Sequence, residues 1–169
     1  MPEVSINFRP IGVIHTPYTE HAPYQPVSGG DQDENAFRVV LEPQFARGLR
    51  DLEAFRYIYL LYHAHRIEGP ARMTVRPPWA GQLEIGLFAS RSPARPNPIG
   101  LSVVRIQKIA GRVIHTSALD VFDGTPLLDI KPYIKELDTK EDANYGWLDR
   151  LEDREHLALH IKGIPHEHR

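Results

Sequence analysis

Residues 106–114 read Ile-Gln-Lys-Ile-Ala-Gly-Arg-Val-Ile, and this stretch decides the fold class. Two apolar, β-rich runs meet near Ala110 and Gly111. A glycine between two such runs predicts a tight turn, with the flanking segments paired as an antiparallel hairpin. The hairpin joins the predicted strands 102–109 and 113–119.

The rest of the chain repeats the pattern of short β-rich segments separated by Gly or Pro. About seven mostly antiparallel strands are therefore expected, in a sheet or barrel rather than a helical bundle. Residues 44–55 place Phe45, Leu49, Leu52 and Phe55 at helical spacing, which predicts a helical turn or two. Residues 16–34 hold three prolines and should form a long loop. The predicted strands outside the hairpin are 11–15, 36–41, 57–64, 72–75 and 84–89.

Length and composition limit the classes of protein that the chain can belong to. Its 169 residues fit one domain, which is large enough to bury a core without disulfides or a structural metal. The absence of cysteine excludes disulfides and thiolate zinc sites. There is no signal-peptide pattern, and no apolar run approaches the roughly 20 residues of a membrane span. A soluble, cytoplasmic protein without a membrane partner is expected.

The net charge of −2 hides an uneven distribution. Residues 56–112 hold nine Lys or Arg against two Glu, interleaved with aromatic residues, whereas residues 137–155 are acidic. A basic, aromatic segment favours a nucleic-acid or nucleotide site. The alternative is that the arginines are spread over several strand faces and only solubilise the surface. In the acidic segment, a helix around 147–151 followed by a strand at 157–161 is predicted.

Residues 91–100 read Arg-Ser-Pro-Ala-Arg-Pro-Asn-Pro-Ile-Gly. Each proline fixes φ near −65° and removes an amide donor, so the run predicts a shaped loop rather than a helix or central strand. Arg91 and Arg95 are permanent cations whose planar forks suit carboxylate or phosphate, and Asn97 can both donate and accept. This run is interpreted as a binding loop.

Residues 119–133 read Leu-Asp-Val-Phe-Asp-Gly-Thr-Pro-Leu-Leu-Asp-Ile-Lys-Pro-Tyr. The Asp-Gly and Thr-Pro pairs mark a sharp turn between two apolar runs. Either Asp123 only caps that turn, or Asp120, Asp123 and Asp129 meet an amine or ribose hydroxyl of a ligand.

Other chemistry is hard to find in the sequence. The pairs His63/His65 and His156/His160 lack an evident third ligand, so no structural metal is expected. There is no nucleophile elbow, Walker loop or dinucleotide-binding glycine pattern. The remaining candidate is a site that binds and orients its ligands, and such a site suits group transfer from an activated cofactor.

Several segments together resemble the TsaA-like (TrmO) family. They are residues 11–18 (IGVIHTPY), the pair Gln25-Pro26, residues 48–63, residues 91–102 and the block 119–133, in the family's order. The resemblance implies a closed or nearly closed β-barrel, which we place at 1–136 as a single domain. The acidic extension that follows, 137–169, is expected to pack on the barrel or the dimer. The resemblance also implies a homodimer that binds S-adenosyl-L-methionine (SAM) without a Rossmann-type fold.

The resemblance further implies methyl transfer from SAM to N6 of a threonylcarbamoyl-adenosine beside the tRNA anticodon. We expect Arg91 to hold the methionyl carboxylate, Asp120 or Asp123 to meet the amino or ribose groups, and Leu101 to pack the adenine. The alternatives are an enzyme acting on a smaller nucleotide or metabolite, and a SAM-binding regulator without catalysis. The implied SAM contacts are Gln25, Pro26, His63, Ala64, Arg91, Leu101, Asp120, Val121, Asp123 and Gly124.

Four residues are candidates for handling the methyl acceptor. Asn97 is expected to accept a hydrogen bond from the N6–H, because the sulfonium already activates the methyl and no strong base is needed. Lys131, Tyr133 and Arg95 are expected to position a phosphate or carboxylate of the target.

Overall fold

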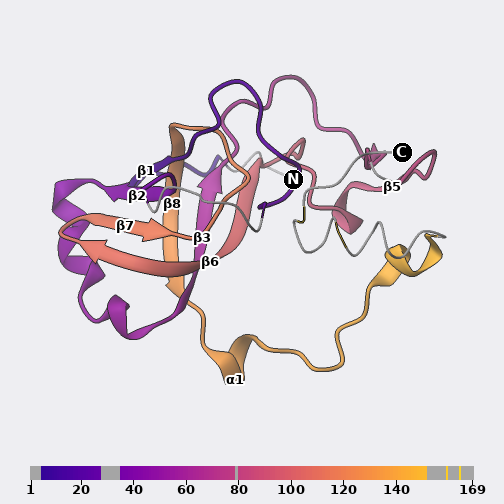
Figure 1. Ribbon diagram of the computed structural model, residues 1–169. Helices are drawn as coiled ribbons and strands as arrows, with labels where there is room; N and C mark the ends of the chain where they lie inside the picture. The colour runs from indigo at the N-terminus through magenta and orange to yellow at the C-terminus, as the bar shows by residue number, and fades with distance from the viewer. Residues whose placement is uncertain (1–4, 28–34, 79, 152–158, 160–163, 165–169) are drawn as a thin grey trace.

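The architecture is a closed, mainly β barrel, as the sequence predicts. A computed structural model describes residues 5–27, 35–78, 80–151, 159 and 164. Six antiparallel strands close a ring in the order β1-β2-β7-β6-β3-β8 (Figure 1). The strands of the ring are β1 (Gly12–His15), β2 (Arg38–Leu41), β3 (Tyr57–His63), β6 (Ile99–Ala110), β7 (Val113–Thr116) and β8 (Thr125–Pro132).

The hairpin expected at 106–114 is present. β6 and β7 pair antiparallel from Ala110 and Val113 outward. Gly111 takes a φ of 59°, a value that glycine adopts without strain. The first strand of the hairpin is longer than predicted, because β6 begins at Ile99, directly after Pro98, the last proline of the predicted binding loop.

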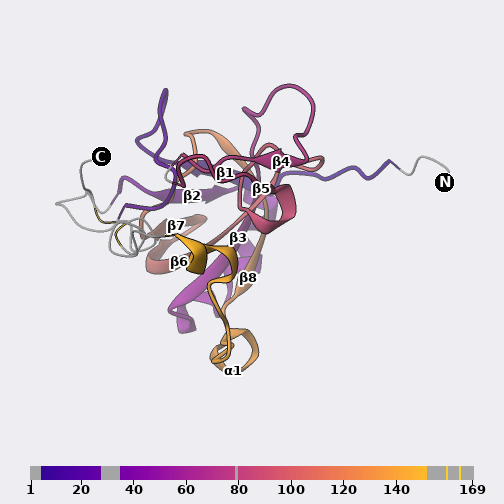
Figure 2. The same cartoon turned by 90° about the vertical axis from the view of Figure 1, so that its right-hand side faces the viewer.

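Two of the seven predicted strands do not enter the barrel. Residues 72–75 and 84–89 contribute only β4 (Thr74–Val75) and β5 (Ile85–Gly86). This small sheet lies to the right of the ring in Figure 1 and in front of it in Figure 2. The ring is closed instead by β8, a strand that the sequence analysis missed. The Asp-Gly and Thr-Pro pairs at 123–126 predicted a turn here, yet Thr125 and Pro126 already belong to β8, which pairs with β1 on one side and β3 on the other.

The barrel interior is filled by alternate side chains of the strands. Inward-facing residues are almost fully buried, and outward-facing ones are half-buried or exposed. This two-residue period is what a sheet with one dry face requires. The largest fully buried side chains of the ring are Ile14, Val39, Ile58, Leu60, Val104, Ile114, Thr116 and Leu127.

Helical segments are short. The turn expected over 44–55 is present as two 3-10 helices, η1 (Pro43–Leu49) and η2 (Leu52–Ala54). Three more short helices are η3 (Leu87–Ala89), α1 (Lys135–Asp138) and η4 (Gly146–Arg150). Within the described residues, no helix is long and apolar enough to cross a bilayer.

The acidic extension begins with α1 and η4. η4 covers most of the helix predicted around 147–151, and the Trp147 Nε1 donates a hydrogen bond of 2.8 Å to the Ala89 carbonyl. The strand predicted at 157–161 lies outside the described residues except for Leu159, which is helical, so that prediction is wrong at this residue.

We predict that Gly12→Ala destabilises the barrel by about 1–3 kcal/mol. A Cβ on Gly12 would lie 2.4 Å from the Val40 carbonyl oxygen of the paired strand, and backbone cannot give way cheaply. Urea unfolding measures the effect. Gly48→Ala is the matched control, because nothing lies within 4 Å of its added Cβ. Equal unfolding midpoints for the two variants would contradict the close β1–β2 approach.

Candidate functional site

Two loops meet at one end of the barrel, where β3 ends and β6 begins. The Ala64 N–H donates to the Pro98 carbonyl at 2.8 Å, which attaches the proline loop, 91–98, to the end of β3. The loop 119–124 leads into β8, whose early residue Leu127 pairs with Tyr62 of β3. The two sequence segments predicted to bind a ligand therefore lie at the same end of the barrel.

Tyr62 lies against a glycine at this end. Gly100 pairs with Tyr62 across the β3–β6 ladder, and a Cβ at Gly100 would lie 2.0 Å from Tyr62 Cε2. The glycine therefore makes room for the ring. The Tyr62 hydroxyl lies 3.1 Å from Ser102 Oγ. Burial raises the pKa of Tyr62 to about 12, so the ring carries a neutral phenol at physiological pH.

A carboxyl and a guanidinium interact electrostatically at this end of the barrel. Burial raises the pKa of Asp120, although the positive charge of Arg91 works against this rise. The charge of Asp120 in turn adds to the effect of burial in raising the pKa of both Tyr62 and Tyr18. Arg91 and Asp120, both expected at a ligand site, therefore influence one another electrostatically. Such a pair is complementary to a ligand that carries both an amino and a carboxylate group.

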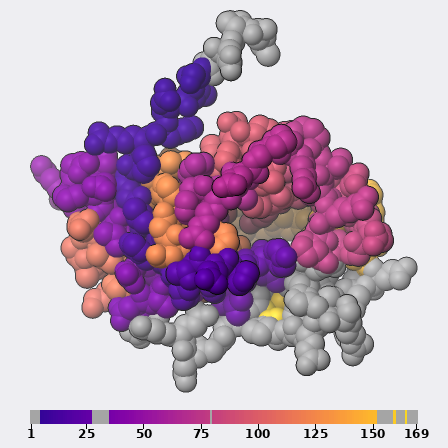
Figure 3. All heavy atoms as spheres, turned by 90° about the horizontal axis from the view of Figure 1, so that it is seen from above, coloured from indigo at the N-terminus to yellow at the C-terminus, as the bar shows by residue number. Residues whose placement is uncertain are grey.

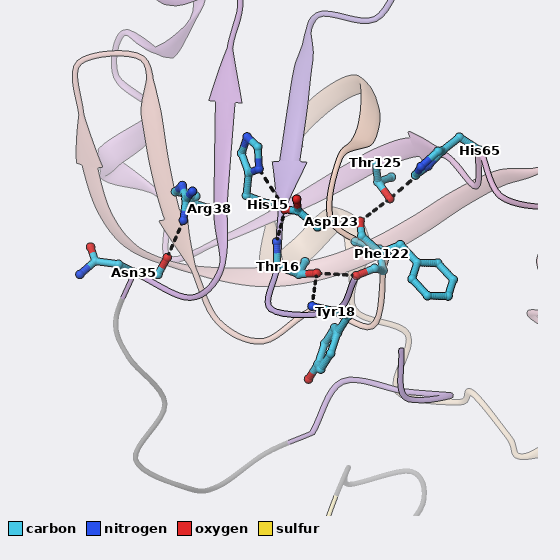
Figure 4. A network of polar contacts seen from close by, with 10 residues as sticks. His15, Thr16, Tyr18, Asn35, Arg38, His65, Phe122, Asp123 and Thr125 are labelled. Atoms are coloured by element: carbon cyan, nitrogen blue, oxygen red, sulfur yellow. Dashed lines mark hydrogen bonds and ion pairs between the residues drawn. The ribbon is translucent and has the colours of Figure 1, made fainter. Parts of the chain in front are cut away.

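Asp123 is used differently from Asp120. Figure 4 shows it beside His15 and Thr16. Its Oδ1 accepts a hydrogen bond of 3.1 Å from the Thr16 N–H and lies 3.0 Å from His15 Nδ1. Burial alone would raise the pKa of Asp123, but hydrogen bonds from the Thr16 N–H, His15 and the Gly124 N–H outweigh burial and lower it. Of the two interpretations of this residue, the contacts favour the turn cap.

Further bonds hold the loop 119–124 in place. The Thr16 hydroxyl donates to the Val121 carbonyl at 2.8 Å, and the Thr125 hydroxyl donates to the Phe122 carbonyl at 2.7 Å. Gly124 takes a φ of 79°, and its N–H donates to the Ile14 carbonyl at 3.0 Å. The backbone beside Asp120 is therefore fixed to β1 and the residues that follow it.

Arg95 stabilises the proline loop from within. One terminal nitrogen donates to the carbonyls of Ser90, at 2.9 Å, and Ser92, at 3.3 Å, and the guanidinium lies 5.6 Å from the Phe88 ring centroid. These carbonyls flank Arg91, so Arg95 fixes the backbone that carries Arg91. Asn97, by contrast, is exposed, and its backbone carbonyl accepts a bond of 2.7 Å from the Ile99 N–H.

Other predicted cofactor contacts lie on a different surface. Strand alternation turns His63 and Leu101 to the outside of the barrel, away from Tyr62 and Ser102, and Leu101 is 51% exposed. Gln25 and Pro26 lie in the loop after β1. Within a single copy of the chain, the Leu101 side chain therefore does not pack beside Asp120.

Lys131 and Tyr133 lie at the opposite end of the barrel. Lys131 pairs with Tyr59, near the start of β3, and its Nζ forms an ion pair of 2.8 Å with Asp129. The Tyr133 ring lies 5.5 Å from that of Tyr59. At about 3.3 Å per residue, the length of β8 separates these groups from the site end by roughly 20 Å. The expectation that they join Asn97 in one site is not met within one chain, because strand direction cannot be read from a motif.

The sequence analysis missed several residues of the site. Gly100 was assigned to the proline loop, and only the start of β6 at Ile99 shows it to be a glycine inside a strand, where a close approach is common. Tyr62 and Ser102 carried no signal, because each looks like an ordinary strand residue until the register is known, and Thr16 looked like an ordinary loop residue. Among the residues that the structure describes, no three His, Asp or Glu side chains gather in a way that could hold a metal ion.

Comparison with known proteins places the chain in a family. Residues 13–139, which include all of the ring except Gly12, match the family described as the tRNA-methyltransferase O N-terminal domain, TrmO_N. The chain belongs to this family. Membership of the TrmO_N family agrees with the closed barrel of the structure and with the resemblance seen in the sequence.

Individual relatives support the same assignment. The chain is 41% identical over 145 residues to a probable S-adenosyl-L-methionine-binding protein of Pyrococcus abyssi, covering 86% of this chain and 77% of that one. It is 39% identical over 152 residues to the tRNA (adenine(37)-N6)-methyltransferase of Escherichia coli, covering 85% and 64%. The crystal structure of TrmO from Pseudomonas aeruginosa matches with a TM-score of 0.66 and 32% identity, covering 85% and 62%. The chain thus spans less than two thirds of these last two proteins.

We predict opposite effects on stability from neutralising the two aspartates. Folding raises the pKa of Asp120, so its charged form lowers stability once the pH rises through that pKa. Folding lowers the pKa of Asp123, so its charged form adds stability that is lost as the pH falls through that pKa. Asp120→Asn should raise the melting temperature at pH 7 and Asp123→Asn should lower it, each by the equivalent of about 1 kcal/mol.

Thermal unfolding between pH 3 and pH 8 provides the measurement. Both differences should shrink below about pH 4, where the carboxyls become protonated in the unfolded chain. A melting temperature that falls at pH 7 in both variants would contradict the assignment of Asp120 as a desolvated carboxyl.

Proposed function

We propose that this chain is a SAM-dependent methyltransferase that acts on N6 of adenosine in tRNA, with threonylcarbamoyl-adenosine beside the anticodon as the acceptor. The observation that carries the proposal is the match of residues 13–139 to the TrmO_N family. The relative from Escherichia coli, named for tRNA adenine N6-methylation, supports the reaction. The basic, aromatic character of residues 56–112 suits a nucleic-acid substrate.

The groups at the site end fit the amino-acid part of SAM. Arg91 would pair with its carboxylate, and the buried carboxyl of Asp120 would accept hydrogen bonds from its ammonium group. A carboxyl with a raised pKa gains from such a cation, because the cation replaces the water lost on burial. His63 and Leu101 lie on the outer face at the same end and would contact the remainder of SAM. Bound SAM supplies an electrophilic methyl group carried on a sulfonium.

Asn97 is the residue we assign to the acceptor. Its exposed carboxamide lies in a loop fixed by three prolines and by Arg95, so its oxygen can accept a hydrogen bond from the N6–H without rearrangement of the loop. Arg95 acts by positioning this loop. Tyr62 keeps its proton, so it can only donate a hydrogen bond or accept one and does not serve as a base.

A second candidate function is SAM binding, or methyl transfer to a smaller nucleotide or metabolite. The relative from Pyrococcus abyssi, of which the chain covers the larger share, carries a name that mentions SAM binding and no acceptor. The acidic balance of residues 137–155 also works against binding of RNA phosphates.

We also propose that the protein forms a homodimer through the outer face of β3 and β6. Apolar side chains of β3 and β6 lie side by side on this face, and Leu101 and Val103 are each about half exposed. Val103→Glu should yield a monomer by light scattering, because a buried interface charge lacks a partner. Gln107→Glu, which adds the same charge further along β6, should leave the dimer intact. Unchanged mass for Val103→Glu would exclude this face.

Methylation of tRNA by the purified protein tests the proposed function. With SAM and tRNA that carries threonylcarbamoyl-adenosine, nucleoside mass spectrometry should detect the N6-methylated product. SAM binding by calorimetry without any methylated nucleoside would favour the second candidate function. No binding at micromolar SAM would contradict both.

Two variants separate cofactor binding from turnover. Arg91→Ala should weaken SAM by about tenfold to a hundredfold, because it removes a charge-assisted pair worth about 1.5–3 kcal/mol. Asn97→Ala should retain SAM affinity within about twofold and lose most of kcat. Calorimetry and single-turnover kinetics measure the two effects. Loss of SAM affinity in Asn97→Ala would move this residue to the cofactor.

A further inference from the structure

A basic cavity lies beside the candidate cofactor site. Its volume is about 680 Å³, and its walls come from the loop after β3, from the small β4–β5 sheet and from the proline loop. Figure 3 shows a hollow bordered by the segment coloured magenta to pink, to which these residues belong. The residues used below are Arg66, Arg72, Arg76, Glu68, Glu84 and Ser92.

The three arginines of the cavity differ in what they contact. The Arg76 Nε forms an ion pair of 3.2 Å with Glu84. The Arg66 guanidinium lies 4.4 Å from the Phe122 ring centroid, and one of its nitrogens donates to the Thr19 carbonyl. Arg72 makes no hydrogen bond or ion pair with any other described residue.

Charge makes the cavity suitable for an anion. Arg76 and Glu84 neutralise one another, which leaves Arg66 and Arg72 against Glu68. Arg66 is held in position by its ring and carbonyl contacts, so it offers a fixed cation, and Arg72 offers a full set of unused donors. A planar guanidinium with free donors favours a bidentate partner such as a carboxylate or phosphate.

The cavity is joined to the cofactor site by both of its loops. Ser92, in the cavity wall, directly follows Arg91. Phe122, beneath Arg66, lies between Asp120 and Asp123 in the other loop. A group held by Arg72 and a base that approaches the cofactor site can therefore belong to one nucleotide or to adjacent nucleotides.

We propose that this cavity is the acceptor subsite, in which Arg72 and Arg66 hold an anionic group of the nucleotide that is methylated. The anion is a carboxylate carried by the modified base or a backbone phosphate of the RNA. The inference rests on the proposed function, because it assumes an RNA acceptor. It gives the basic segment 56–112 a local role rather than a general surface charge.

The test compares Arg72→Ala with Arg50→Ala in the full chain. Arg50 is exposed and lies after η1, so its loss changes the net charge equally without touching the cavity. The probe is a fluorescent anticodon stem-loop RNA that carries threonylcarbamoyl-adenosine, with binding followed by anisotropy. Arg72→Ala should weaken the RNA by about tenfold or more relative to Arg50→Ala. It should leave SAM affinity, measured by calorimetry, within about twofold.

A second RNA, with the threonyl carboxylate converted to its methyl ester, identifies the anion. If the carboxylate is held, the penalty of Arg72→Ala disappears with the ester. If a phosphate is held, the penalty persists. Equal RNA affinity for Arg72→Ala and Arg50→Ala would overturn the inference. Wild-type protein that binds the RNA through Arg72 but transfers no methyl would contradict the proposed function alone.

Discussion

Closure of the barrel at β1 is the constraint on which the site depends. β1 has only four residues, yet it pairs with β2 on one side and β8 on the other. It fits between them because Gly12 lets the Val40 carbonyl approach. The same closure brings His15 and Thr16 against Asp123, whose carboxylate fixes the loop 119–124. The position of Asp120 thus follows from the backbone of the ring.

The two aspartates of the loop 119–124 differ in how their surroundings affect their charged forms. Asp123 gains more from its hydrogen bonds than it loses by burial, so it stabilises the fold. Asp120 is half-buried, and burial keeps its pKa raised although the positive charge of Arg91 opposes the rise. A desolvated carboxyl on a fixed backbone is costly for folding and useful for binding a cation. Tyr62, neutral and packed against Gly100, completes a site whose geometry exists before any ligand binds.

Much of the fold could be predicted from local signals. Gly111 and the flanking β-branched runs indicate the β6–β7 hairpin, and the β-rich segments indicate a barrel. β8 could not be recognised, because its prolines suggest a turn and only its two neighbours show that it is a strand. The placement of Lys131 failed for a related reason, since a sequence block does not reveal which end of a strand meets the site. Arg91 and Asp120 could be singled out as ligand-binding candidates from their own motifs, and the family resemblance only added SAM as the ligand, whereas Tyr62 required the register.

The central claim is that the loops 91–98 and 119–124 form the cofactor site at the end of β3. A crystal structure with S-adenosylhomocysteine tests this most directly. The account predicts the amino-acid part of the ligand between Arg91 and Asp120, with the proline loop in the conformation described here. Density for the ligand at the other end of the barrel, beside Lys131 and Tyr133, would contradict it.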